Sequence, residues 1–271
     1  MPIDVGWYEV DGPIDPTSPS RPNIRQSGVH SAVARALASW LGDELICARI
    51  DLSGRPLVVG IGGSVAVGKS TVAADLVAYL ATRGITTTVI ATDGFLFPNS
   101  VLAARGAIDR KGEPDTYDED ALAAVLGAIR DGAASVEIPT YSHRSFDVVA
   151  GVPVMVGGIV LVEGVNALQP RLAARQDLSV YLDAPDDVVK RWFVDRFLRH
   201  VDDAETDPQS FYRRFLVLNP DGRADMAVSV WEMINLPNLV RFVAPTRANA
   251  DLVVTFDATH SVQRVTRTAA G

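Results

Sequence analysis

One eight-residue stretch limits the architectures open to this chain more than any other feature of its sequence. Residues 63–70 read Gly-Ser-Val-Ala-Val-Gly-Lys-Ser, which matches the pattern G-x-x-x-x-G-K-[ST] in full. An apolar run at residues 57–61 precedes it, and a helical pattern at residues 69–83 follows it. A strand, a glycine-rich loop and a helix in that order are typical of a phosphate-binding loop. The motif therefore predicts an α/β protein with this loop at the end of a strand.

Short apolar runs alternate with helical patterns along the rest of the chain. The expected strands are residues 57–61, 86–92, 158–162, 178–182 and 252–256. The expected helices are residues 29–41, 69–83, 118–130, 186–200 and 224–235. The strands are mostly apolar without strict alternation, as expected when helices cover both faces of a parallel sheet. We predict a doubly wound, mainly parallel sheet of the P-loop kinase type, with a helical lid or acceptor-binding region at about residues 186–248.

The size and composition favour one folded domain. The chain has 271 residues, of which 48% are hydrophobic, so a large core can form. We expect an irregular, proline-containing arm at residues 1–28 and a single kinase domain at residues 29–271. The lone cysteine, Cys47, is expected to pack in the core as a small hydrophobic residue.

Charge and hydropathy narrow the range of partners. The net charge of −8, without a basic cluster, argues against a nucleic-acid partner. The N-terminal residues lack the basic start and apolar run of a signal peptide. No uncharged apolar stretch reaches the roughly 20 residues needed to span a bilayer. We therefore expect a cytoplasmic protein without a membrane partner, acting as a homodimer on a small molecule.

The phosphate-binding loop points to ATP and Mg²⁺ as cofactors. Its backbone N–H groups and the start of the following helix would bind phosphate oxygens. Lys69 would reach the β- and γ-phosphates, and Ser70 would bind Mg²⁺. The expected nucleotide-binding residues are Gly63, Ser64, Val65, Ala66, Val67, Gly68, Lys69, Ser70 and Thr71. The chain lacks the guanine-reading and transporter signatures of other P-loop classes, which favours a small-molecule kinase.

Two acids follow expected strands, at the edge of the sheet where ligands bind. Glu163 ends a run of four apolar residues and would bind Mg²⁺ through water. Asp93 would accept or orient the proton of the attacking hydroxyl. A third acid, Asp183, is expected to cap the helix that follows it. On that helix, Arg196 would neutralise charge on the transferring phosphoryl group.

Several further motifs give the chain a family resemblance over residues 57–265. They are Thr92-Asp93-Gly94-Phe95-Leu96-Phe97-Pro98-Asn99, Lys111-Gly112, Tyr117-Asp118, Tyr141-Ser142-His143, Phe146-Asp147, Glu163-Gly164-Val165-Asn166-Ala167-Leu168-Gln169, Tyr181-Leu182-Asp183-Ala184, Arg196-Phe197-Leu198, Ile234-Asn235 and Pro245-Thr246-Arg247. With the phosphate-binding loop, they resemble those of bacterial type I pantothenate kinases, within the phosphoribulokinase and uridine kinase group of P-loop kinases.

The resemblance implies roles for individual residues. It makes Asp93 the catalytic carboxylate that faces the primary hydroxyl of pantothenate. The residues it places around pantothenate are Tyr141, His143, Arg196 and Asn235. It also places His260 near the adenine of ATP. A carboxylate, two hydroxyls and an amide on the acceptor suit cationic and amide side chains of this kind.

The chain departs from the family at a few acceptor-side and regulatory positions. Phe193 and Phe146 stand where a tyrosine is common, so both positions lack a hydroxyl. Ala74 replaces an arginine, and His200 replaces an aromatic residue. These departures keep open a paralogous kinase with another hydroxyl acceptor, such as a nucleoside or a small hydroxy acid. A non-catalytic nucleotide-binding regulator is the other alternative, although Lys69, Ser70, Asp93 and Glu163 are all present.

Overall fold

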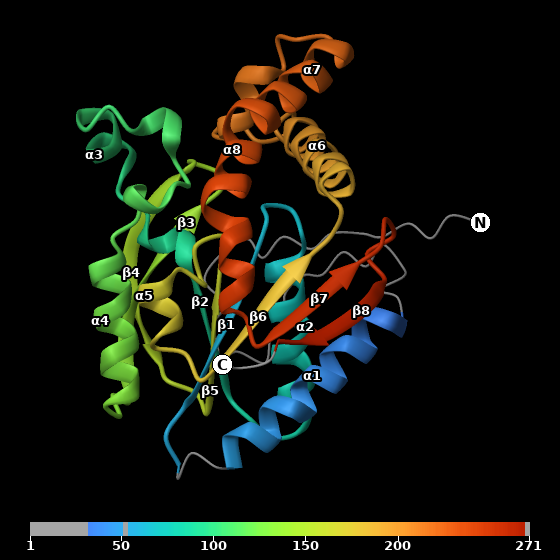
Figure 1. Cartoon of the computed structure of the whole chain (residues 1–271). Coiled ribbons are helices and arrows are strands. Elements are labelled where there is room, and N and C mark those ends of the chain that lie inside the picture. Colours follow the sequence, from blue (N-terminus) through green and yellow to red (C-terminus); the bar gives the residue numbers. More distant parts are fainter. Residues whose placement is uncertain (1–31, 51–53, 269–271) are drawn as a thin grey trace.

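A six-stranded sheet forms the centre of the protein. The computed structural model describes residues 32–50 and 54–268. The strand order is β2-β5-β1-β6-β7-β8, and all neighbouring strands pair in parallel except β7 and β8. In Figure 1 the arrows of β6 and β7 point to the upper edge of the sheet, and helices α6 and α7 project above that edge. The parallel pairing brings the carboxyl ends of β1, β2 and β5 to the same edge.

The strands and helices have the following bounds. The strands of the sheet are β1 (Leu57–Gly63), β2 (Thr87–Ala91), β5 (Ile159–Glu163), β6 (Leu178–Asp183), β7 (Leu252–Phe256) and β8 (Val262–Arg267). A separate antiparallel hairpin consists of β3 (Ser135–Ser142) and β4 (Asp147–Met155). The α-helices are α1 (Ala32–Ile50), α2 (Lys69–Thr82), α3 (Asn99–Ala104), α4 (Glu119–Arg130), α5 (Pro170–Ala173), α6 (Asp186–Asp203), α7 (Pro220–Val230) and α8 (Leu236–Asn238).

The sheet separates two hydrophobic cores, as the predicted doubly wound fold requires. In β1, Val59 and Ile61 pack in one core with Leu76 of α2. Val58 packs in a second core with Leu126 of α4. All seven residues of β1 are buried, which explains its unbroken apolar sequence. The phosphate-binding loop therefore begins at the end of a fully buried strand.

The helical segment that descends from above the sheet changes its hydrogen-bonding pattern along its length. α7 continues into a π-helical turn, η5 (Trp231–Asn235), then α8, a second π-helical turn, η6 (Leu239–Val243), and a 3₁₀ segment, η7 (Ala244–Asn249). Pro237 lies between the two π-helical turns and has no backbone N–H to donate. Turns of this kind are frequent at functional sites.

The five predicted strands and the predicted helices are present, with bounds that differ by a few residues at most of their ends. The hairpin and β8 were not predicted, because their sequences mix apolar and exposed polar residues. The prediction for Cys47 is wrong, since this residue is exposed on α1. The predicted arm at residues 1–28 lies outside the described residues. Within the described residues, no helix is both long and apolar enough to cross a membrane.

Candidate active site

The phosphate-binding loop connects β1 to α2 and carries a buried lysine. Gly68 adopts a φ of 99°, a conformation that glycine reaches without strain. Lys69 is 8% exposed, and its Nζ donates to the carbonyl oxygens of Ser64 at 2.8 Å and Gly63 at 3.3 Å. Burial lowers the pKa of Lys69, while the nearby charges of Glu163 and Asp93 raise it. A cation therefore lies at the loop, ready to interact with phosphate oxygens.

The two predicted acids lie at the ends of β5 and just beyond β2. Glu163 is 8% exposed and accepts a hydrogen bond from the Ser70 hydroxyl at 3.1 Å. Asp93 accepts a hydrogen bond from the buried Tyr117 hydroxyl at 3.0 Å. Burial raises the pKa of Glu163, the charge of Lys69 lowers it, and the charge of Asp93 raises it. The two carboxyl groups and the lysine thus share one electrostatic site.

The side chains at this site suit a magnesium ion. Mg²⁺ prefers oxygen ligands and usually takes only one or two carboxylates from the protein, together with phosphates and waters. The Ser70 hydroxyl and the Glu163 carboxylate are oxygen donors 3.1 Å apart beside the phosphate-binding loop. These two oxygen donors fit this requirement.

A glycine directly after each acid lets another segment approach closely. A Cβ on Gly94 would lie 2.1 Å from the Pro139 carbonyl oxygen of β3. A Cβ on Gly164 would meet the side chain of Thr92, which directly follows β2, within bonding distance. Only glycine fits at both positions, so the close packing around the two acids depends on these residues.

A second cation, Lys111, interacts electrostatically with Asp93. Its Nζ donates to Asn99 Oδ1 and to the Phe146 carbonyl oxygen, both at 2.7 Å. It also lies 4.8 Å from the ring centre of Tyr141. Burial lowers the pKa of Lys111 to about 8, although the charges of Asp147 and Asp93 raise it. An ammonium group in this position can bind an anionic part of an acceptor.

The tip of the β3–β4 hairpin is joined to the segment that follows α6. Arg144 forms two hydrogen bonds with the Asp207 carboxylate, at 2.7 and 2.8 Å. The Phe211 N–H donates to the Arg144 carbonyl oxygen at 2.9 Å. The ring of Phe146 stacks on that of Phe211 with centres 4.2 Å apart. We call these four residues the hairpin clasp.

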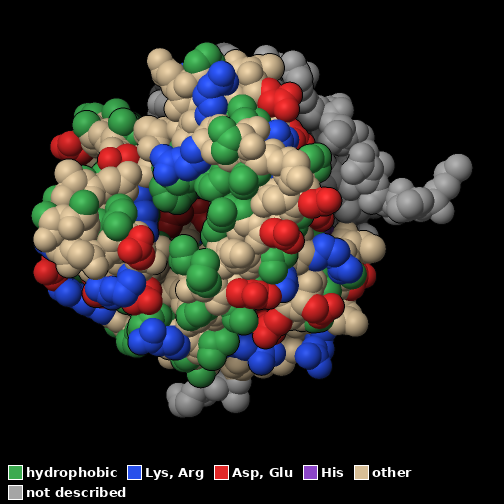
Figure 2. Space-filling model, turned by 90° about the horizontal axis from the view of Figure 1, so that it is seen from above, with side chains coloured by type: hydrophobic (Ala, Val, Ile, Leu, Met, Phe, Trp, Pro, Cys, Tyr) green, Lys and Arg blue, Asp and Glu red, His purple; other side chains and the backbone are tan. Residues whose placement is uncertain are grey.

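The clasp is next to the predicted arginine of α6. Arg196 Nε donates to His200 Nε2 at 3.3 Å, and its charge acts on both Lys69 and Glu163. Figure 2, a view from above, shows a hollow with acidic side chains on its floor and basic side chains at its side. Such a hollow can exclude bulk water from a reaction between a phosphate and a bound hydroxyl.

Comparison with known proteins assigns the family. Residues 58–201 match the family model described as "Phosphoribulokinase / Uridine kinase family". A pantothenate kinase of Streptococcus mutans is 37% identical over 225 residues, covering 79% of this chain and 73% of the relative. A pantothenate kinase of Streptomyces coelicolor is 38% identical over 253 residues, covering 88% and 75%. This chain belongs to the phosphoribulokinase/uridine kinase family.

A solved structure supports the fold. D-glycerate 3-kinase from Cryptococcus neoformans superposes with a TM-score of 0.57 at 16% identity, covering 88% of this chain and 100% of that one. Members of the phosphoribulokinase/uridine kinase family use ATP with Mg²⁺, and this chain is an ATP-dependent kinase. The predicted fold class and cofactors are therefore confirmed.

Most of the predicted site residues lie on elements at this edge of the sheet. Lys69, Asp93, Glu163 and Arg196 interact electrostatically. Tyr141 and His143 lie on and just after β3, and their rings are in edge contact at 5.2 Å. The described contacts do not place the other two predicted residues against a ligand site. Asn235 Nδ2 donates to the carbonyl oxygen of its own helix at Val230, and His260 stacks on Trp192.

Sequence reasoning gave no role to two residues that contact the site. Tyr117 hydrogen-bonds Asp93, and Lys111 lies beside Tyr141. Both belong to motifs that carry the family resemblance, Lys111-Gly112 and Tyr117-Asp118. The retention of these motifs was the only available signal, because both residues lie on irregular segments far in sequence from their partners.

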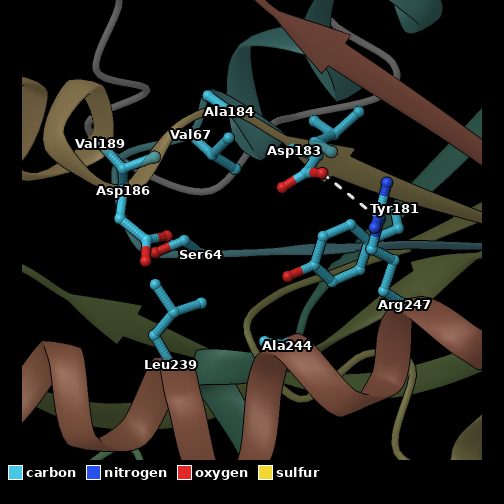
Figure 3. A pocket seen from close by; sticks show the side chains of 11 residues that line it. Ser64, Val67, Tyr181, Asp183, Ala184, Asp186, Val189, Leu239, Ala244 and Arg247 are labelled. Carbon is cyan, nitrogen blue, oxygen red and sulfur yellow. Dashed lines mark ion pairs between the residues drawn. The ribbon is translucent and has the colours of Figure 1, made fainter.

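The predicted capping role of Asp183 is wrong. Helix α6 has Pro185 at its N-cap, without a capping side chain. The Asp183 carboxylate instead pairs with Arg247 Nε at 3.3 Å, as the dashed line in Figure 3 marks. The pair lines a cavity of about 230 Å³ together with Ser64 of the phosphate-binding loop. Asp183 therefore connects the end of β6 to η7.

Proposed function

We propose that this enzyme transfers the γ-phosphoryl group of ATP to the primary hydroxyl of pantothenate, giving 4′-phosphopantothenate for coenzyme A biosynthesis. The observation that carries the proposal is the position of Asp93. Its carboxylate accepts from Tyr117 and interacts with Lys69 on the nucleotide side and Lys111 on the acceptor side. The pantothenate kinases that resemble this chain support the choice of acceptor.

The residues of this chain divide the work of phosphoryl transfer between them. Asp93 accepts the proton as the acceptor hydroxyl forms its bond to the γ-phosphorus and the bond from that phosphorus to ADP breaks. Lys69 moves from its loop carbonyls to the phosphate oxygens, and Arg196 neutralises their charge. Ser70 and Glu163 would hold Mg²⁺, which would offset the negative charge of the phosphates.

The acceptor binds between the hairpin and the helical region above the sheet. Lys111 and His143 face its polar groups, together with the Tyr141 hydroxyl. Asn235 of η5 contributes an amide. Asn238, three residues further along the same helical segment, donates to the Gly112 carbonyl oxygen at 2.9 Å, so this segment contacts the loop that carries Lys111. We assign residues 186–248 as the acceptor-binding lid of a single domain, and His260 as a neighbour of the adenine.

The second candidate function, a kinase with another hydroxyl acceptor, is favoured by the two phenylalanine positions. Phe146 stacks on Phe211, and the ring centre of Phe193 lies 5.7 Å from that of Trp231. Phenylalanine has no hydroxyl, so neither position can donate a hydrogen bond to an acceptor. A kinase for a nucleoside or a small hydroxy acid would exploit this difference.

The deciding experiment measures ATP consumption and product mass with pantothenate, nucleosides and small hydroxy acids. Of these compounds, we expect only pantothenate to be phosphorylated, with 4′-phosphopantothenate as the product. Phosphorylation of another compound, with pantothenate unchanged, would establish the alternative. Asp93→Ala should reduce turnover at least about 100-fold and still bind Mg·ATP, since the loss of a general base does not touch the phosphate-binding loop.

We also propose a cytoplasmic homodimer. Apolar side chains on the helical region above the sheet support self-association, because Met233 is 70% exposed and Val240, two helical turns away, is 58% exposed. The molar mass from light scattering should equal twice that of the chain. The double variant Met233→Glu, Val240→Glu should then reduce it to one chain.

A further inference from the structure

Arg196 has a hydrogen-bond partner one helical turn away on the same helix. Residues four apart lie on one face of an α-helix. Arg196 Nε donates to His200 Nε2 at 3.3 Å, and both side chains are half-buried. The ring nitrogen that accepts must carry a lone pair, so His200 is neutral with its proton on Nδ1. Burial, followed by the charge of Arg196, lowers the pKa of His200 to about 3, in agreement with this assignment.

Rings from two other elements contact the His200 ring. His143, next to the hairpin strand β3, lies on one side with ring centres 6.4 Å apart and planes 18° apart. Tyr212 of η4 (Phe211–Phe215) stacks with ring centres 4.7 Å apart and planes 21° apart. A ring stacked in this way has little freedom to rotate away from Arg196. The orientation of the Nε2 lone pair is therefore determined by the surrounding fold.

The other N–H donors of the Arg196 guanidinium group take no part in the bond to His200. Arginine has five N–H donors, and the bond to His200 uses the single one on Nε. The other four belong to the two Nη atoms, which together can bind two oxygens of a phosphoryl group. The Arg196 charge acts on Lys69 and Glu163, which lie at the phosphate-binding loop.

We propose that His200 is a positioning residue that orients Arg196, so that its two Nη groups face the transferring phosphoryl group. The inference rests on the proposed role of Arg196 in transfer. His200 itself contacts neither substrate. Its contribution is specific to the acceptor atom of its ring, because an aromatic ring of similar size could stack between His143 and Tyr212 without accepting from Nε.

Two substitutions separate the acceptor atom from the ring. His200→Phe keeps the stacking and loses the acceptor, while His200→Gln loses the ring and keeps an oxygen that can accept from Nε. We expect His200→Phe to reduce kcat about tenfold, the lower range for a lost hydrogen bond to a charged group. The KM values for ATP and the acceptor should change less than about twofold, since Arg196 acts on the transition state. His200→Gln should retain kcat within about threefold.

A double-mutant cycle with Arg196→Met tests whether His200 acts through Arg196. Methionine has no hydrogen-bond donor in its side chain, so His200→Phe should cause no further loss in that background. An equal loss in both backgrounds, or an unchanged kcat in His200→Phe alone, would overturn the inference. Normal kcat in Arg196→Met would instead remove the proposed role of Arg196, and with it the role of His200.

A binding measurement separates this inference from the choice of acceptor. ADP with Mg²⁺ and aluminium fluoride imitates the transferring phosphoryl group without an acceptor. His200→Phe should weaken binding of this complex about tenfold and leave Mg·ADP affinity unchanged. Equal affinities of the wild-type and His200→Phe proteins for the complex would overturn the inference even if pantothenate proves to be the acceptor.

Discussion

The buried side chain of Tyr117 supports the proposed catalytic role of Asp93. It donates to Asp93 Oδ1 at 3.0 Å, and burial followed by the charge of Asp93 raises the Tyr117 pKa well above its usual value. The phenol therefore stays protonated and orients the carboxylate. Tyr117→Phe should reduce kcat about tenfold with little change in the KM for ATP, since a hydrogen bond to a charged group is lost.

A matched control for Tyr117→Phe exists on the surface. The half-buried Tyr79 also donates to an aspartate, Asp43, at 2.6 Å, in a hydrogen bond exposed to solvent. Tyr79→Phe should leave steady-state kinetics unchanged. An equal effect of the two substitutions would show that Tyr117 acts only through stability.

Lys111 should give acceptor binding a pH dependence. Its pKa of about 8 lies below the ordinary value of 10.5, so the ammonium form is present below pH 8 and is lost as the pH rises through it. For the carboxylate of pantothenate, kcat/KM should therefore fall above about pH 8, because this ratio reports the free enzyme. Lys111→Met should have a lower kcat/KM and lose this decrease. A decrease that persists in Lys111→Met belongs to another group.

Among the helices and strands, the sequence predicted those whose burial leaves an apolar pattern in the sequence. The five parallel strands are apolar because helices cover them on both sides, and α4 shows its apolar face at helical spacing. The β3–β4 hairpin was missed because residues such as Val149 are exposed and Pro139 interrupts β3. The pairing of Asp183 with Arg247 joins residues far apart in sequence, so local patterns favoured the wrong capping role.

The hairpin clasp should matter for the acceptor and little for the nucleotide. Phe211→Ala removes the ring that stacks on Phe146, and an aromatic pair contributes about 0.5–1.5 kcal/mol beyond burial. We expect the KM for the acceptor to rise about three- to tenfold, with the KM for ATP unchanged. Val149→Ser, on the exposed side of the same hairpin, is the control and should behave as wild type. Equal increases in both KM values would contradict a role limited to the acceptor.

For the whole molecule, nucleotide binding should appear as thermal stabilisation. A ligand at 100 times its Kd stabilises by about 2.7 kcal/mol. In a protein of this size that raises Tm by about 5–10 °C. Mg·ATP should produce this shift in the wild type. Lys69→Ala should lose most of it, since Lys69 lies at the phosphate-binding loop.

Lys190→Ala provides the comparison for the thermal shift. Lys190 of α6 forms a surface ion pair with Glu232 of η5 at 2.8 Å. Its shift with Mg·ATP should equal that of the wild type, because surface ion pairs contribute little. A full shift in Lys69→Ala would exclude Lys69 from nucleotide binding.

The two acid–glycine pairs, Asp93-Gly94 and Glu163-Gly164, have a consequence for directed evolution. A methyl group on either glycine would collide with the neighbouring segment, at Pro139 or Thr92. A mutant library therefore cannot vary either glycine without displacing the segment that carries the neighbouring acid. Libraries that seek new acceptors should conserve both dipeptides and diversify the positions around the hairpin clasp instead. Surviving clones would then change what is phosphorylated while retaining the machinery of transfer.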